Sequence, residues 1–188
     1  VKTKYRQSIL QKRNSLGSAE VSNLSKIILK NADLELSLSG IKTLGSYLSS
    51  NNEVDLEALT SSRLKKNLLT TFPRVKPNHS MNLIAPKNFK KLGRNKYNIS
   101  EPLDGDEIHP IDHEIIIIPT VGIDKNGYRL GYGGGYYDRF LESVKQRSNR
   151  PLLIGLIYDF QFIDDSFNEL HDIKLDIVFS EQQCKKFY

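Results

Sequence analysis

Ile115-Ile-Ile-Ile118 is a short, continuous apolar run, and Leu152-Leu-Ile-Gly-Leu-Ile157 is a second one further along the chain. Such runs are typical of parallel strands that helices bury on both faces. Residues 175–179 are interpreted as one more strand. Since predicted helical stretches separate the strands, we expect an α/β fold with a mostly parallel sheet flanked by helices. Ligands of such sheets bind beyond the carboxyl ends of the strands, so we expect the site there.

The rest of the chain alternates between predicted helices and strands. The spacing of apolar residues predicts helices over 2–16, 18–29, 56–66 and 136–144. Strands are predicted over 41–48, 68–72 and 81–85, the last two closed by Pro73 and Pro86. The polar segment 88–110 is interpreted as one long irregular segment, and loops of this length are often functional.

Length and composition favour one domain over residues 1–188, because the chain is long enough for a substantial core and shows no internal boundary. Its 38% hydrophobic and 26% charged residues are typical of a soluble globular protein. The apolar runs are too short to span a bilayer, and the first residues lack the apolar segment of a signal peptide. We therefore expect a cytoplasmic protein. Cys184 is the only cysteine, which excludes an internal disulfide and a cysteine-built zinc site.

A glycine-rich segment, Arg129-Leu-Gly-Tyr-Gly-Gly-Gly-Tyr-Tyr-Asp-Arg139, directly precedes and enters the fourth predicted helix. Closely spaced glycines permit positive φ angles and let a ligand approach the main-chain N–H groups. The segment matches neither the P-loop nor the dinucleotide fingerprint. Arg129 can pair with phosphate oxygens, and Asp138 can hold Mg²⁺ that bridges them. These features together indicate nucleotide phosphate; a turn that serves geometry alone is the alternative.

Other polar positions are less distinctive. Lys2 and Arg6 lie four residues apart on one face of the first helix, which is either a solvated face or an anion site. Glu53 follows a predicted strand and is either a substrate-binding carboxylate or a loop charge. His171-Asp172 and Asp176 are candidate metal ligands or structural groups. The net charge of +5 and the pI near 9.2 fit an anionic small molecule or a nucleic acid.

Residues 119–141, Pro119-Thr-Val-Gly-Ile-Asp-Lys-Asn-Gly-Tyr-Arg-Leu-Gly-Tyr-Gly-Gly-Gly-Tyr-Tyr-Asp-Arg-Phe-Leu141, closely resemble the signature of the 5-formyltetrahydrofolate cyclo-ligase family. The resemblance extends over nearly the whole chain in family order, through Lys2 to Arg6, Tyr47-Leu48, Glu53-Val-Asp55, Phe72-Pro-Arg74, Met81, Ile99-Ser-Glu-Pro102, Gly155, Gln161 and His171-Asp172. The lead-in Pro119-Thr-Val-Gly-Ile-Asp124 departs from the family's usual Pro-Gly-Leu-Ala-Phe-Asp.

The resemblance implies an ATP- and Mg²⁺-dependent ligase that converts 5-formyltetrahydrofolate to 5,10-methenyltetrahydrofolate through a phosphorylated formyl intermediate, releasing ADP and phosphate. It implies 5-formyltetrahydrofolate and ATP as partners. We further expect a monomer that binds no nucleic acid and no membrane. Catalytic roles fall to Arg129, Tyr136 and Asp138, and metal binding to Asp138 and Asp172. ATP binding falls to Lys2, Arg6, Arg129, Leu130, Gly131, Tyr132, Gly133, Gly134, Gly135, Tyr136 and Tyr137. Substrate binding falls to Glu53, Met81, Tyr132, Gly133, Gly134, Gly135 and Tyr136.

Two alternatives stay open at this point. One is a nucleotide-dependent enzyme with the same glycine loop and a different acceptor. The other is a basic nucleic-acid-binding module in which the tyrosines of the loop stack on bases. Glu53, Met81 and the 99–102 segment favour the folate reading over the first alternative, since those matches concern the folate side.

Overall fold

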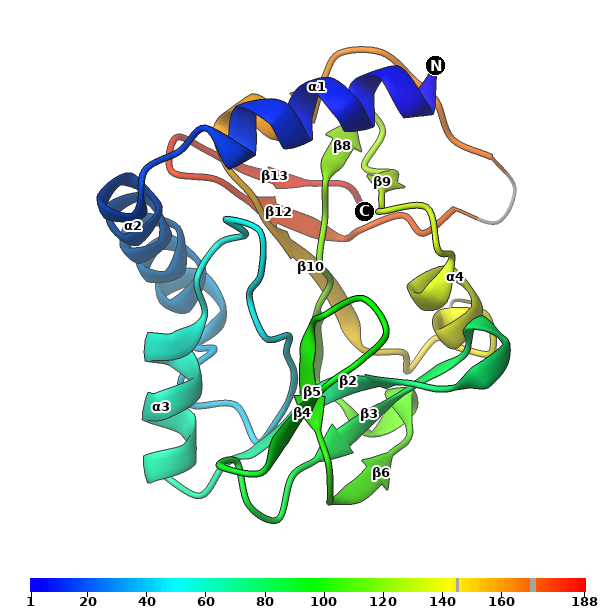
Figure 1. Ribbon diagram of the computed structural model, residues 1–188. Helices are drawn as coiled ribbons and strands as arrows, with labels where there is room; N and C mark the ends of the chain where they lie inside the picture. The colour runs from blue at the N-terminus through cyan, green and yellow to red at the C-terminus, as the bar shows by residue number, and fades with distance from the viewer. Residues whose placement is uncertain (145, 170–171) are drawn as a thin grey trace.

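Within the described residues, the central sheet has eight strands in the order β13-β12-β10-β7-β1-β2-β3-β6. Figure 1 shows β13 and β12 toward the top of the view and β2, β3 and β6 toward the bottom. The computed structural model describes residues 1–144, 146–169 and 172–188. The strands are β1 (Thr43–Gly45), β2 (Leu69–Val75), β3 (Met81–Ala85), β6 (Asp106–Ile108), β7 (Ile115–Ile117), β10 (Leu152–Leu156), β12 (Ile177–Phe179) and β13 (Cys184–Lys186). From β2 to β12 all neighbours are parallel, while β3, β6 and β13 add antiparallel edges. The predicted mostly parallel sheet is confirmed.

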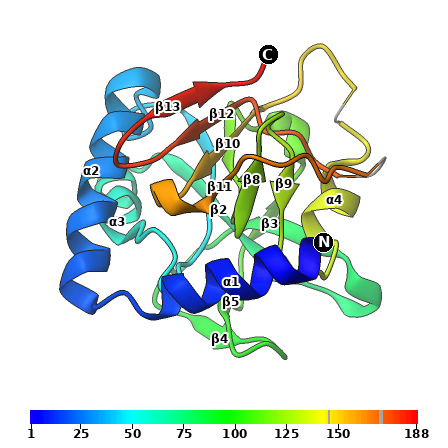
Figure 2. The ribbon, with the colours of Figure 1, turned by 90° about the horizontal axis from the view of Figure 1, so that it is seen from above.

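Helices cover both faces of this sheet. Successive side chains of β7 point to opposite faces, and all of them are apolar, so both faces must be buried. Ile115 and Ile117 pack in one buried cluster with Ile28 of α2 (Ser18–Leu36) and with α3 (Glu57–Lys65). Ile116 packs in a second cluster with Leu141 of α4 (Tyr136–Leu141). Figure 2 shows α2 and α3 on one side of the strands and α4 on the other. The continuous apolar run at 115–118 reflects burial on both sides.

A smaller sheet lies beside the first and is covered by α1 (Lys2–Asn14). Its strands are β11 (Phe162–Ile163), β8 (Gly122–Asp124) and β9 (Arg129–Leu130), in that order. Ile9 of α1 packs with Val121, Leu130 and Ile163 in a third cluster. The buried carboxylate of Asp124, the last residue of β8, stabilises the turn between β8 and β9. Its Oδ1 accepts hydrogen bonds from the N–H groups of Asn126 (2.9 Å) and Tyr128 (2.8 Å). This turn leads the chain into Arg129.

The segment 88–110 is more regular than expected. It contains a hairpin of β4 (Leu92–Arg94) and β5 (Ser100–Pro102), followed by β6 at the sheet edge. The prediction of one long irregular segment is therefore wrong. The strands are three residues each, too short to show alternation in the sequence. The described part of the chain also has three short 3₁₀ turns, η1 (Pro77–His79), η2 (Pro110–Asp112) and η3 (Asp159–Gln161).

Several boundaries also differ from expectation: the strand predicted over 41–48 is only Thr43–Gly45, and the helix predicted over 136–144 ends at Leu141. The strand predicted to stop before Pro73 continues to Val75. Strand β1 pairs with β2 only as far as Thr71, so no parallel neighbour needs the N–H that Pro73 lacks, and β3 pairs along the other side. Helix α2 runs to Leu36 instead of 29, because Ala32 is buried four residues after Ile28 and extends the apolar stripe. In the described residues, no helix combines the length and the apolarity that crossing a bilayer requires.

Replacing Ile28 with alanine is expected to lower the free energy of unfolding by about 2–5 kcal/mol, because the side chain is fully buried and its loss leaves a cavity. Urea unfolding measures the change. Leu34→Ala on the same helix is the matched control, since Leu34 is 77% exposed, and it should stay within about 0.5 kcal/mol of the wild type. Equal losses in the two variants would contradict the assigned buried face of α2.

Candidate active site

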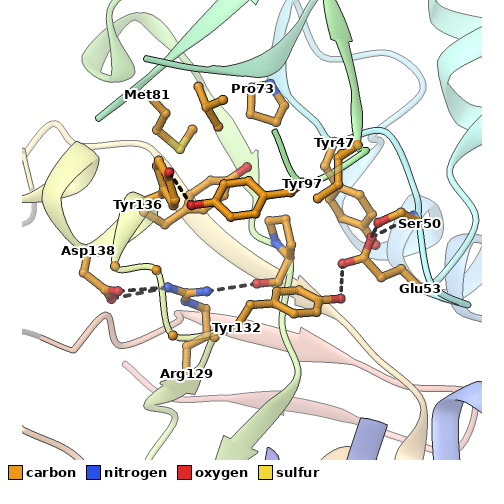
Figure 3. Close-up of a pocket in the computed structure, with 18 of the residues that line it drawn as sticks. Tyr47, Ser50, Glu53, Pro73, Met81, Tyr97, Arg129, Tyr132, Tyr136 and Asp138 are labelled. Atoms are coloured by element: carbon orange, nitrogen blue, oxygen red, sulfur yellow. Dashed lines mark hydrogen bonds and ion pairs between the residues drawn. The ribbon is translucent and has the colours of Figure 1, made fainter. Parts of the chain in front are cut away.

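A cavity of about 520 Å³ lies beyond the carboxyl ends of β1, β2 and β7 (Figure 3). Tyr47 follows β1, Val75 ends β2 and Pro119 follows β7. The structure therefore has a cavity at the edge of the sheet where the sequence predicts a ligand site. Every residue to which the family resemblance gives a site role lines it: Lys2, Arg6, Glu53, Met81, Arg129, Leu130, Gly131, Tyr132, Gly133, Gly134, Gly135, Tyr136, Tyr137, Asp138 and Asp172.

The glycine loop between β9 and α4 needs glycine for two separate reasons. At Gly131 there is no room for a side chain, because an added Cβ would lie 2.5 Å from Nη1 of Arg129. At Gly133 the backbone has a φ of +100°, a region that side chains disfavour, and the side chain of Arg6 lies beside it. Arg6 also donates from Nε to the carbonyl oxygen of Gly131 at 2.8 Å. Helix α4 begins at Tyr136, directly after the loop, as predicted.

Arg129 is the buried cation of the cavity, with only 7% of its surface exposed. Its Nη2 donates to both carboxylate oxygens of Asp138, at 3.2 and 3.3 Å, and its Nη1 donates to the carbonyl oxygen of Pro119 at 3.1 Å. In the described part of the chain, Nε of Arg129 and the hydroxyl of Tyr137 are buried without a hydrogen-bond partner. Buried polar atoms are almost always satisfied, so these two leave bonding capacity for a ligand or water.

A second cation–carboxylate pair lies at the N-terminal end of α1. Lys2 Nζ is 2.7 Å from Asp172 Oδ2 and 3.3 Å from Glu169 Oε1. Partial burial lowers the pKa of Lys2, but the two carboxylates outweigh it and raise the pKa above its ordinary value, so the ammonium group stays charged. Each carboxylate assigned to metal binding, Asp138 and Asp172, is thus already paired with a cation assigned to phosphate.

The donor set tests whether Mg²⁺ fits this cavity. Within residues 1–144, 146–169 and 172–188, no three His, Cys, Asp or Glu side chains converge as a metal cage. Mg²⁺ at phosphate sites commonly takes one or two carboxylates and completes its shell with phosphate oxygens and water. Asp138 and Asp172, both lining the cavity, match that donor set. The residues fit an ion that binds together with a polyphosphate.

Glu53 lies at the other end of the cavity from Asp138 (Figure 3). It is 7% exposed, its Oε1 accepts from the hydroxyl of Tyr132 at 2.7 Å, and its Oε2 accepts from the N–H of Ser50 at 2.9 Å. Burial raises the pKa of Glu53, against the lowering effect of Arg13, Tyr132 and Ser50. Met81 and Pro73 form an apolar wall of the cavity, opposite Arg129 and Tyr132 (Figure 3).

Tyr97 lines the cavity but was not assigned a site role from the sequence. The β4–β5 hairpin carries it to Tyr136, where the two hydroxyls lie 2.8 Å apart and the rings meet edge to face at 84°. That hydrogen bond lowers the pKa of Tyr97 and raises that of Tyr136. One indication of Tyr97 was present in the sequence, the length of the polar segment 88–110. That length indicated a functional loop but did not indicate which of its residues reaches the cavity.

One candidate metal ligand lies outside the cavity. Asp176 makes a two-pronged ion pair with Arg150, at 2.6 and 2.7 Å, and accepts from the N–H of Leu153 at 2.8 Å. These bonds give it a structural role beside β10. His171, named with Asp172 in the sequence analysis, lies outside the described residues.

Comparison with known proteins agrees with the geometry. Residues 1–181 match the model of the 5-formyltetrahydrofolate cyclo-ligase family. The 5-formyltetrahydrofolate cyclo-ligase of Mycoplasma genitalium is 31% identical over 179 residues, which cover 94% of this chain and 96% of that protein. The solved structure of Aquifex aeolicus 5,10-methenyltetrahydrofolate synthetase is similar with a TM-score of 0.84 and 31% identity, covering 99% of this chain and 92% of that one. The synthetase from Mycoplasma pneumoniae is similar with a TM-score of 0.77 and 27% identity, covering 96% and 98%.

Replacing Gly131 with alanine is expected to displace the guanidinium of Arg129 from Asp138 and Pro119, because the new Cβ would overlap Nη1. We expect the free energy of unfolding, measured with urea, to fall by about 1–3 kcal/mol. Gly40→Ala is the control, since the nearest atom to its Cβ position is 3.6 Å away, and its stability should be unchanged or slightly higher. A Gly131→Ala protein as stable as this control would show that Arg129 is not held as described.

Proposed function

We propose, from the premise that the chain belongs to the 5-formyltetrahydrofolate cyclo-ligase family and is a ligase of that kind, that the cavity binds ATP and 5-formyltetrahydrofolate side by side. The product is 5,10-methenyltetrahydrofolate, with ADP and phosphate released. One observation supports this proposal above the others. A single cavity has a cationic, glycine-lined end and an end with a buried carboxylate, with an apolar wall along one side.

The triphosphate of ATP fits the cationic end. Lys2, Arg6 and Arg129 supply positive charge there, and the glycine loop supplies backbone that no side chain shields. Arg129 can shift one of its hydrogen bonds from Asp138 to a phosphate oxygen, and Lys2 can do the same from Asp172. The two carboxylates released in this way would hold Mg²⁺, which would neutralise charge on the phosphates during transfer.

The pterin of the folate fits the other end. The reduced pterin of this substrate has a flat pyrimidine ring with N–H donors along one edge, fused to a puckered ring that carries N5. Glu53 offers a buried carboxylate for those donors, and its Oε2 is fixed by the N–H of Ser50. Met81 and Pro73 offer an apolar surface for the ring face. In this orientation the N5-formyl group points toward Tyr132 to Tyr136 and the γ-phosphate.

Two steps then close the ring. An amide-like formyl oxygen is a poor leaving group, so it first attacks the γ-phosphorus of ATP, the bond to ADP breaks, and the formyl group becomes a phosphorylated imidate. N10 attacks the formyl carbon next, the C–O bond breaks, and phosphate leaves with the oxygen while N10 loses its proton. Phosphoryl transfer depends mainly on positioning and on stabilising charge. Arg129, already buried and fixed by Pro119, provides a preorganised cation for that charge.

The cationic end alone does not select folate, but the family to which the chain belongs favours 5-formyltetrahydrofolate over a different acceptor. The nucleic-acid interpretation makes no use of this cavity. The cytoplasmic location and the monomeric state remain predictions from the sequence.

The first test is an absorbance assay with the purified protein, 5-formyltetrahydrofolate, ATP and Mg²⁺. We expect methenyltetrahydrofolate to form, and its formation to stop when ATP or Mg²⁺ is left out. Absence of product, with ATP still bound by calorimetry, would reject the folate acceptor and keep the nucleotide site.

Variants at the two ends of the cavity should separate the two substrates. Glu53→Gln is expected to raise the KM for 5-formyltetrahydrofolate about 10- to 100-fold, because it removes a charged acceptor, with little change in the KM for ATP. Arg6→Ala should raise the KM for ATP about tenfold instead. Exposed residues serve as matched controls, Glu20→Gln for the first and Lys4→Ala on the same helix for the second. Identical effects of the two cavity variants on both substrates would argue against separate ends.

A further inference from the structure

Arg13 is the one fully buried cation of α1, with 1% of its surface exposed, and none of the roles proposed above uses it. Its Nη2 donates to the hydroxyl of Tyr132, and its Nε donates to the carbonyl oxygen of Asn51 at 3.0 Å. The guanidinium also lies 5.4 Å from the centre of the Tyr132 ring. Arg13 therefore contacts both the glycine loop and the loop that carries Glu53.

These contacts continue into a directed chain of hydrogen bonds. Arginine has only donors, so the hydroxyl of Tyr132 accepts from Arg13 and must point its own proton elsewhere. That proton goes to Oε1 of Glu53, at 2.7 Å. Burial and the nearby Glu53 raise the pKa of Tyr132, which keeps the hydroxyl protonated although the ring is 43% exposed. Arg13 thereby fixes the direction of the bond that holds the folate-side carboxylate.

The loop beneath Glu53 is tied to the same end of α1. Asn52 donates from Nδ2 to the carbonyl oxygens of Arg13 (3.1 Å) and Leu16 (2.9 Å). Hydrogen bonds of the Arg13 side chain and its carbonyl oxygen thus connect the end of α1 with the 50–53 loop and with the glycine loop. Tyr132 belongs to the glycine loop proposed to bind ATP, and its hydroxyl reaches Glu53 at the folate end.

We propose that Arg13 is a positioning residue that couples the two substrate sites, so that a glycine loop ordered around ATP orients Glu53 for 5-formyltetrahydrofolate. The inference rests on the function proposed above. Coupling between two ligands is reciprocal, so folate must strengthen ATP binding by the same factor. The fork of arginine is required, because Nε and Nη2 reach two acceptors on different loops at once, which the single ammonium of lysine cannot reproduce.

A second buried arginine supplies the comparison with a purely structural role. Arg63 of α3 is 0% exposed and donates to the carbonyl oxygens of Leu38, Ile41 and Leu69 and to the hydroxyl of Thr70. It does not line the cavity. Arg63→Lys therefore removes a buried guanidinium fork without touching Glu53 or the glycine loop.

The test measures dissociation constants by calorimetry for 5-formyltetrahydrofolate with and without a non-hydrolysable ATP analogue and Mg²⁺. In the wild type we expect the analogue to tighten folate binding at least fivefold, the lower range of typical coupling. In Arg13→Lys and Arg13→Met the ratio should approach one, and in Tyr132→Phe as well, because each breaks the chain at a different link. Arg63→Lys should keep the wild-type ratio, even where its melting temperature falls as far as that of Arg13→Lys.

The outcomes separate the inference from the function on which it rests. A wild type that forms no methenyltetrahydrofolate would reject the proposed function. An active wild type with a ratio of one, or an Arg13→Lys protein that keeps the full ratio, would overturn the coupling alone. If Arg13→Met does not fold, Arg13→Lys and Tyr132→Phe decide the question, since the second removes one hydroxyl from a partly exposed ring.

Discussion

Burial of β7 on both faces is the constraint on which the rest of the structure depends. Its isoleucines pack against α2 and α3 on one side and against α4 on the other, so the strand must lie inside the sheet with parallel neighbours. Parallel neighbours bring the carboxyl ends of β1, β2 and β7 to one edge, and the loops leaving that edge build the cavity. Packing in the core therefore determines where the cavity lies.

Local signals account for what the sequence could predict. The apolar runs at 115–118 and 152–157 predict buried strands, and the dense glycines predict a ligand loop before α4. Non-local partners decided the rest. Strand β2 passes through Pro73 because β3 pairs with it, and the short strands of the β4–β5 hairpin carry no periodicity. The sequence does not distinguish Arg13 from the other basic residues of α1, because its hydrogen-bond partners Asn51 and Tyr132 lie 38 and 119 residues away.

The cavity combines two kinds of electrostatic environment at short range. At one end the charges are paired, and the pair of Lys2 with Asp172 is partly exposed and can exchange partners at modest cost. At the other end the carboxylate of Glu53 is buried and held by neutral donors, so its orientation is costly to change. The first arrangement suits a charged ligand that arrives with its own cation, and the second suits a ligand recognised by shape and hydrogen bonds.

The two ion pairs also bear on how a reaction cycle ends. Arg129 is paired with Asp138 and Lys2 with Asp172, so two of the cavity's cations are already neutralised by carboxylates of the protein. If a triphosphate separates the members of each ion pair, the pair can form again after the bond between the γ-phosphate and ADP is broken. The negative charge is then divided between two smaller anions. In the proposed reaction, closure of the pairs would compete with the departing ADP and phosphate for the same cations. On that proposal, the two ion pairs would favour product release as well as neutralise Lys2 and Arg129 between turnovers.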